Sequence, residues 1–153
     1  MRFTHLDDAG AARMVDVTSK QPTVREATAT GLVTRSAAVI DALRSGTVPA
    51  GDALAVAAGG HRRRQEGAGP AAAGARDRRP RVVLDLAVVD AGVAITATVR
   101  TADRTGVEME ALTAVTVAAL AIVDMVKGVD RSAAISDCRI VAKSGGRSGD
   151  WTR

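Results

Sequence analysis

The chain has 153 residues, which suits one domain with a sizeable core. Apolar residues make up 46% of it but aromatics only 1%, so Ala, Val, Leu, Ile and Met must form the core. The single cysteine, Cys138, excludes an internal disulfide and is typical of a reducing compartment. No apolar run approaches the roughly 20 residues of a membrane span, and the N-terminus has no signal-peptide core. We therefore expect a soluble, cytoplasmic protein with no membrane partner.

The net charge of +4 comes from one unusual stretch. Residues 59–81 contain seven arginines against Glu66 and Asp77, a net of +5, and no Val, Ile, Leu or Phe. Of the chain's 21 basic and 17 acidic residues, 14 and 15 lie outside this stretch, a net of −1. No aromatic residue interleaves the arginines and no folded motif presents them, so we expect no nucleic-acid partner.

The first half of the chain alternates strand and helix patterns. Short β-branched runs predict strands over residues 14–20 and 27–36. The segment 36–46 predicts a helix, with a serine to cap its start and a glycine to end it. A second helix is expected to begin at 51–57, directly before the arginine-rich stretch.

The second half predicts a hairpin, a long helix and a strand. Apolar and polar residues alternate over residues 82–102, with the turn at Asp90-Ala91-Gly92. A helix is expected over 108–129 and a strand over 133–143. The order of elements favours a single α+β domain, an antiparallel sheet with helices packed on one face.

The long helix contains the first candidate site. No charge occurs between residues 111 and 123, which predicts a helix buried over most of its circumference. Asp124 follows in an apolar setting, and Lys127 is close enough to pair with it. Glu110 lies within about 40° of the same helix face, about 21 Å from Asp124 along the axis. The two carboxylates share a site only if two copies pack antiparallel; the alternative is a structural ion pair at the helix end.

Two further groups of cations are candidates for anion binding. In residues 142–151, glycines and serines surround Lys143 and Arg147, a composition suited to holding a phosphate, although a basic tail explains it equally well. Lys20 and Arg25 flank Pro22, where a solvated face is the alternative. With two histidines and one cysteine, no ligand spacing fits a metal site.

Three segments carry a family resemblance. "THLDDAGAARMVDVTSKQPTVREATATG", "RTGVEMEALTAVTVAALAIVDMVKGVDR" and "RIVAKSGGRSGDW" closely resemble cyclic pyranopterin monophosphate synthase, the molybdenum cofactor biosynthesis protein C family. The match covers about 1–58 and 82–151 and is specific, since the central motif "TGVEMEALTA…VAAL.I.DM.K.VD" is long and has no gaps.

The resemblance implies a fold, an assembly and a reaction. The fold is ferredoxin-like, and the protein is a homohexamer, a trimer of dimers with active sites at the dimer interface. The enzyme is a lyase that acts after a radical GTP cyclase. It converts 3′,8-cyclo-7,8-dihydro-GTP to cyclic pyranopterin monophosphate and pyrophosphate, and we expect it to need no cofactor.

The resemblance also assigns roles to residues of this chain. The family's catalytic aspartate and partner lysine fall on Asp124 and Lys127. Positions that contact the substrate fall on Met109, Glu110, Lys143, Lys20 and Arg25, and Arg147 supplies a further cation for a triphosphate.

The chain departs from the family at one residue and in one stretch. A catalytic lysine of the family is replaced by Ala50, and residues 59–81 lack the expected helix and substrate-binding histidine, although the length is preserved. Read one nucleotide later, synonymous codons for this stretch can encode both missing features, with the histidine near position 75. We therefore interpret 59–81 as the product of two compensating frameshifts. The alternative to an active synthase is a catalytically impaired family member with a structural role.

Overall fold

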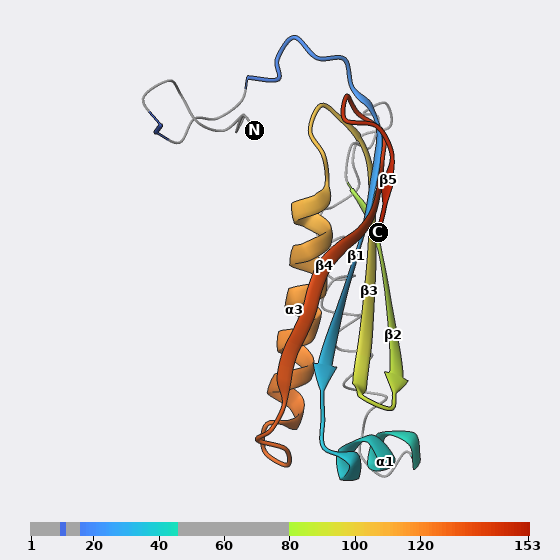
Figure 1. Cartoon of the computed structure of the whole chain (residues 1–153), viewed down its shortest axis with the longest axis vertical. Coiled ribbons are helices and arrows are strands. Elements are labelled where there is room, and N and C mark those ends of the chain that lie inside the picture. Colours follow the sequence, from blue (N-terminus) through green and yellow to red (C-terminus); the bar gives the residue numbers. More distant parts are fainter. Residues whose placement is uncertain (1–9, 12–15, 46–79) are drawn as a thin grey trace, which may run out of the picture.

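A computed structural model of the chain describes residues 10–11, 16–45 and 80–153 (Figure 1). In chain order the described elements are β1 (Thr23–Thr34), α1 (Ala37–Ser45), β2 (Arg81–Val89), β3 (Gly92–Asp103), α3 (Glu108–Val126), β4 (Ala134–Ser144) and β5 (Trp151–Thr152). The arginine-rich stretch, Ala50 and the helix expected at 51–57 lie outside these residues, except for the last two residues of the stretch.

The strands form one antiparallel sheet in the order β2-β3-β1-β4-β5. β1 occupies the centre and pairs with β3 on one side and β4 on the other. Along the chain, β1 and α1 are followed by the β2–β3 hairpin and then by α3 and β4. This succession and the strand order are those of the ferredoxin-like fold. The α+β class predicted from the sequence is therefore confirmed.

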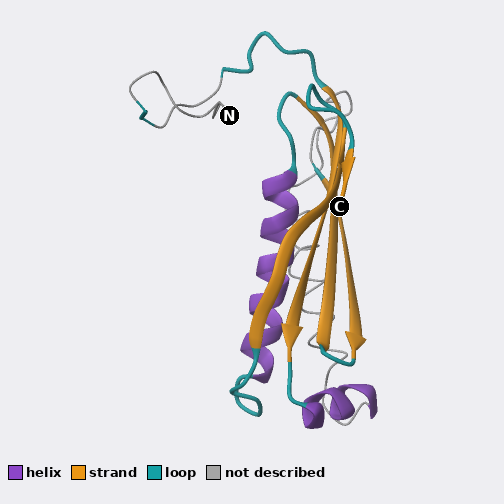
Figure 2. Cartoon of the chain, in the orientation of Figure 1, coloured by secondary structure: helices purple, strands orange, loops and turns teal. Residues whose placement is uncertain are grey.

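Helix α3 covers one face of the sheet, and the core lies between them (Figure 2). On that face, β1 and β3 contribute alternating small and β-branched side chains, including Ala29, Val33, Ile95 and Val99. Gly31 in the middle of β1 allows the close approach of the helix, because a Cβ there would lie 2.5 Å from Cγ1 of Val115.

The strand and helix boundaries differ from the predictions in four main places. Strand β1 spans Thr23–Thr34, so it begins and ends earlier than the predicted 27–36. Residues 16–20 form a turn and not a strand, with the amide of Lys20 bonded to the carbonyl of Val17. Helix α3 ends at Val126, before the predicted position 129. The short strand β5 was not predicted; it pairs with β4 after the glycine-rich loop and returns the chain to the sheet.

The lower end of the sheet in Figure 1 is held by a buried carboxylate. Asp130, only 5% exposed, follows α3 and accepts a hydrogen bond from the amide of Ser36, directly before α1. Its other oxygen accepts from the amide and hydroxyl of Ser132. The Arg35 guanidinium is also buried here, and no hydrogen bond reaches its nitrogens within the described structure, so Asp130 stabilises it by charge.

The outer face of α3 remains exposed in one subunit. Its apolar side chains Met109, Val117, Leu120 and Met125 are between 41% and 64% exposed. The expectation that the helix is buried over most of its circumference is therefore wrong for the isolated chain, since the sheet covers only one side of it. By length and hydropathy α3 also meets the minimum for a membrane span, but its inner side packs on the sheet as a core helix does.

Candidate functional site

The candidate residues fall into two groups at opposite ends of α3. Asp124 and Lys127 lie at its C-terminal end, and Lys143 and Arg25 lie beside its N-terminal end. Sixteen residues of helix separate Glu108 from Asp124, a distance of about 24 Å along the axis. The candidate residues therefore form two separate groups and not one compact site within the described part of the chain.

Asp124 and Lys127 form the ion pair expected from their spacing. The Lys127 ammonium donates to Oδ1 of Asp124 at 2.5 Å. The setting differs from the prediction, because the two side chains are 71% and 68% exposed and not enclosed by apolar groups. An exposed ion pair of this kind adds little to the stability of the fold, so stability does not explain why these two residues occur together.

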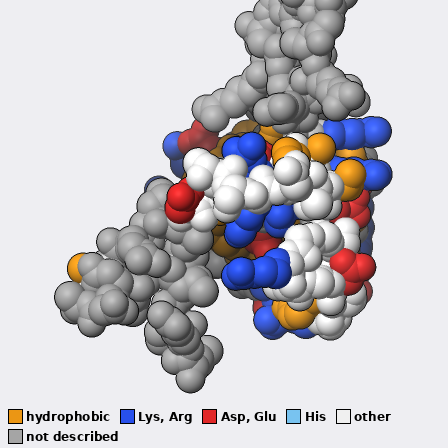
Figure 3. Space-filling model, turned by 90° about the horizontal axis from the view of Figure 1, so that it is seen from above, with side chains coloured by type: hydrophobic (Ala, Val, Ile, Leu, Met, Phe, Trp, Pro, Cys, Tyr) orange, Lys and Arg blue, Asp and Glu red, His pale blue; other side chains and the backbone are white. Residues whose placement is uncertain are grey.

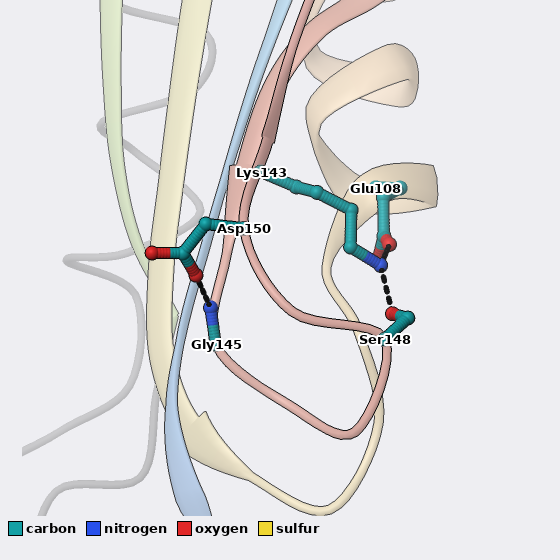
Figure 4. Close-up of polar contacts among 5 residues, drawn as sticks. All are labelled: Glu108, Lys143, Gly145, Ser148 and Asp150. Carbon is teal, nitrogen blue, oxygen red and sulfur yellow. Dashed lines mark hydrogen bonds and ion pairs between the residues drawn. The ribbon is translucent and has the colours of Figure 1, made fainter.

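At the other end, Lys143 contacts two side chains. Its ammonium donates to Oε1 of Glu108 at 2.6 Å and to the hydroxyl of Ser148 at 2.9 Å (Figure 4). The Lys143 and Glu108 side chains are 24% and 26% exposed, so this pair is far better shielded from water than the Asp124 pair. We call Arg25, Glu108, Lys143 and Ser148 the upper cluster.

Arg25 completes the upper cluster from the start of β1. Its Nε donates to the carbonyl of Asp103 at 2.8 Å, which fixes the guanidinium near the first turn of α3. Burial raises the pKa of the Glu108 carboxyl, but the hydrogen bond from Lys143 and the charges of Lys143 and Arg25 outweigh burial. The pKa of Glu108 therefore lies below its ordinary value of 4.5, and the carboxylate is charged at neutral pH.

The glycine-rich loop after β4 is shaped by close backbone contacts. Gly145 has a φ of +78° and passes so near the Val24 carbonyl that no side chain would fit there. Gly146 packs against the Arg25 guanidinium, and the Gly145 amide donates to Asp150 at 2.9 Å (Figure 4). The loop is thus an ordered part of the site, which argues against the alternative of a loose basic tail.

The remaining candidates lie around these groups without joining them. Lys20 is half-buried in the turn before β1, and Arg147 is exposed at the tip of the glycine-rich loop. Met109 and Glu110 are exposed on the first turn of α3. Seen from this end of the molecule, Lys and Arg side chains gather between the loops (Figure 3). Among the described residues, no three His, Cys, Asp or Glu side chains form a group that could hold a metal.

Sequence reasoning did not identify Glu108 as part of the site. Acidic residues are common in the first turn of a helix because they interact favourably with the helix dipole. The position of Glu108 in the sequence therefore did not indicate a role in the site. Only the topology, which brings the end of β4 beside the start of α3, reveals that Glu108 faces Lys143. Asp150 was also not identified. Its partner is the backbone amide of Gly145, and residue types and spacing do not predict such a contact.

Comparison with known proteins gives consistent results over the whole chain. The model of the MoaC family matches residues 14–61 and 79–146. A protein of Streptomyces coelicolor is named cyclic pyranopterin monophosphate synthase. It is 55% identical over an alignment of 164 positions, which covers 99% of this chain and 90% of that protein. A protein of the same name from Nocardioides is 51% identical, with 99% and 96% covered.

A third relative comes from Mycobacterium tuberculosis. It is named cyclic pyranopterin monophosphate synthase 2 and is 48% identical over 159 aligned residues, covering 99% of this chain and 91% of that protein. The matched segments contain α3, the upper cluster except Ser148, and both residues of the Asp124–Lys127 pair. The chain belongs to the MoaC family.

Proposed function

We propose that the chain is a cyclic pyranopterin monophosphate synthase of molybdenum cofactor biosynthesis. It converts 3′,8-cyclo-7,8-dihydro-GTP to cyclic pyranopterin monophosphate and pyrophosphate in the cytoplasm, after a radical GTP cyclase. Family membership and the names of the relatives support this function. The observation that carries it here is the placement of a cationic cluster and an acid–lysine pair at the two ends of one helix, α3.

The upper end of the molecule binds the triphosphate in this proposal. Hydrogen bonds hold the side chains of Lys143 and Arg25, and Lys20 and Arg147 lie in neighbouring loops. Several cations at one end of a sheet lower the cost of bringing a polyanion there, and the backbone at Gly145 and Gly146 has no side chains to block the approach of phosphate oxygens.

The Asp124–Lys127 pair carries out proton transfer. Ring rearrangement and closure of the cyclic phosphate need a group that accepts a proton and one that donates it, and a carboxylate beside an ammonium supplies both. Met109 and Glu110 contact the substrate from the opposite end of the helix. The side chains of Asp124 and Lys127 are exposed in one subunit, so a partner subunit is needed to exclude water from them.

A second copy of the chain packed antiparallel along α3 brings the half-sites together. Val117 lies midway between Glu110 and Asp124 and is 53% exposed, with Leu120 beside it at 56%. A two-fold axis at Val117 places the Asp124–Lys127 pair of one copy at the level of Met109 and Glu110 in the other. The same contact buries the apolar outer side of α3. Three such dimers form the hexamer.

The arginine-rich stretch is a frameshifted segment in this proposal. The family match stops at residue 61 and resumes at 79, so residues 62–78 are the part that the family model does not match. The alignment with the Streptomyces coelicolor protein spans 164 positions, whereas this chain has 153 residues, so this relative contains residues that the chain lacks. The support for a changed reading frame is the unmatched stretch itself and its composition. The nucleotide sequence tests this idea: a shifted frame across 58–81 that does not encode the helix and histidine excludes it.

The second candidate is a family member without full catalysis and with a structural role. Ala50 at the position of the family's lysine, together with the absent histidine, favours it. A turnover assay separates the two. The purified chain is mixed with the cyclic GTP precursor and pyrophosphate release is followed; the synthase proposal fails if assembled protein releases none.

A further inference from the structure

Glu108 and Lys143 form an ion pair that differs from a comparable pair elsewhere in the molecule. Arg44 and Asp90 also lie 2.6 Å apart, but the Asp90 side chain is 97% exposed in the β2–β3 turn. Glu108 is only 26% exposed and lies at the site. Since a shielded ion pair is stronger and better ordered than an exposed one, the Glu108 contact is able to fix the direction of the Lys143 side chain.

The donors of Lys143 show what this contact leaves available. An ammonium has three N–H donors, and the described structure gives two of them to Glu108 and Ser148. These two contacts set the position of the nitrogen and the direction of the remaining N–H. A lysine on its flexible four-carbon stem would otherwise sample many directions.

The absence of a side chain at Gly106 leaves room for the Glu108 carboxylate. The Glu108 carboxylate folds back over Gly106, and the three atoms nearest to a Cβ added at Gly106 all belong to this carboxylate. Gly106 has no positive φ, and alanine therefore fits the backbone there. The substitution Gly106→Ala displaces Glu108 without removing its charge, which makes it a selective tool.

We propose that Glu108 is a positioning residue for Lys143, which holds the ammonium with one N–H directed at a phosphate oxygen of the substrate. The role rests on the proposed synthase function. Lys143 makes the contact, and Glu108 acts through it. Because the contact is present before and during the reaction, its loss raises KM more than it lowers kcat.

Kinetics of three variants and one control test the positioning role. Glu108→Ala is expected to raise KM for the cyclic GTP precursor about 10-fold or more. Glu108→Gln recovers part of this loss, since its amide oxygen still accepts from Lys143. Gly106→Ala raises KM as well, although the carboxylate is intact. Asp90→Ala, which removes the partner of Arg44 in the exposed pair, leaves KM unchanged. A Glu108→Ala enzyme with KM within about twofold of the parent overturns the proposal.

A titration by NMR examines the pair without turnover. The chain has four glutamates, so labelling their carboxyl carbons gives a simple spectrum. The pKa of Glu108 is expected to rise in Lys143→Gln, and to rise in the parent protein when inorganic pyrophosphate binds, because a second anion then shares the ammonium. A pKa that Lys143→Gln does not move, or pyrophosphate that leaves it unchanged, overturns the proposal. If the parent protein releases no product, the synthase function fails and this titration alone decides the role of Glu108.

Discussion

Lys143 and Glu108 lie 35 residues apart in the sequence and share an ion pair of 2.6 Å at the upper end of the sheet. The second ion pair of interest, Asp124 with Lys127, lies about 24 Å away at the other end of α3. One helix thus connects an anion-binding half-site to an acid–lysine half-site. In the proposed function a complete site is formed by two subunits that pack through the exposed apolar side of the same helix.

The first prediction concerns the proton-transfer pair. Asp124→Asn is expected to lower kcat by about 10²- to 10⁴-fold, because the amide cannot accept a proton. The hexamer should remain intact, since the side chain is 71% exposed and adds little to stability. Pyrophosphate release and size-exclusion chromatography with light scattering measure the two effects.

Asp137→Asn is the matched control for this change. Asp137 forms a longer, exposed ion pair with Arg139 on β4, with 3.6 Å between the two charged atoms. The control should retain the parent kcat. An Asp124→Asn enzyme as fast as the Asp137→Asn enzyme would remove Asp124 from the mechanism.

The second prediction concerns the outer side of α3. Val117→Arg places a charge at the proposed two-fold axis, where it faces its own copy in the partner, and the dimer dissociation constant should rise at least about 10-fold. Light scattering across a protein dilution series detects the change. Ala91→Arg, in the exposed β2–β3 turn, should have no effect. An unchanged mass for Val117→Arg at the lowest concentrations would contradict antiparallel packing about this residue.

The third prediction concerns the contact between α3 and the sheet. Gly31→Ala should lower the free energy of unfolding by about 1–3 kcal/mol, because the added Cβ meets the side chains of Val115 and Cys138. Urea unfolding at a fixed protein concentration measures the change. Gly128→Ala is the control, since a Cβ there has no atom within 4 Å. Equal stability of the two variants would show that the helix does not approach β1 so closely.

The fourth prediction concerns acid stability. Hydrogen bonds from Ser132 and Ser36 hold the pKa of Asp130 well below its ordinary value of 3.8. A lowered pKa means that the unfolded chain binds a proton more readily than the folded one. The stabilisation is therefore complete above pH about 4 and is lost as the pH falls towards the folded pKa.

Asp130→Asn tests this behaviour. At neutral pH its melting temperature should fall by several degrees, because Asp130 also neutralises the buried Arg35. Below pH 4 the melting temperatures of the variant and the parent should converge. A constant difference between them from pH 7 to pH 3 would show that the charge of Asp130 does not contribute.

The sequence predicts most of the sheet because its patterns are local. Alternation over residues 82–102 and the Asp90-Ala91 turn define the β2–β3 hairpin, and a long uncharged apolar segment indicates α3. The strand expected from residues 14–20 fails over 16–20, where Asp16 caps a turn through Thr18. Short polar side chains that bond to the nearby backbone compete with strand formation, and β-branched composition alone does not detect this.

The site is less predictable because its contacts are not local. The spacing of Asp124 and Lys127 predicts their ion pair, since it lies within one helical turn. The partner of Lys143 was not predictable, because it comes from an element 35 residues away that only the topology brings near. The apolar run of α3 was interpreted as burial within the chain, but apolar residues needed for an interface give the same sequence pattern.

The most direct measurement is pyrophosphate release from 3′,8-cyclo-7,8-dihydro-GTP by the purified, assembled protein. The account predicts release that accompanies formation of cyclic pyranopterin monophosphate, that Asp124→Asn abolishes, and that increases when lysine replaces Ala50 and the shifted frame is restored across 58–81. Assembled protein that releases no pyrophosphate would contradict the proposal that this chain is a synthase.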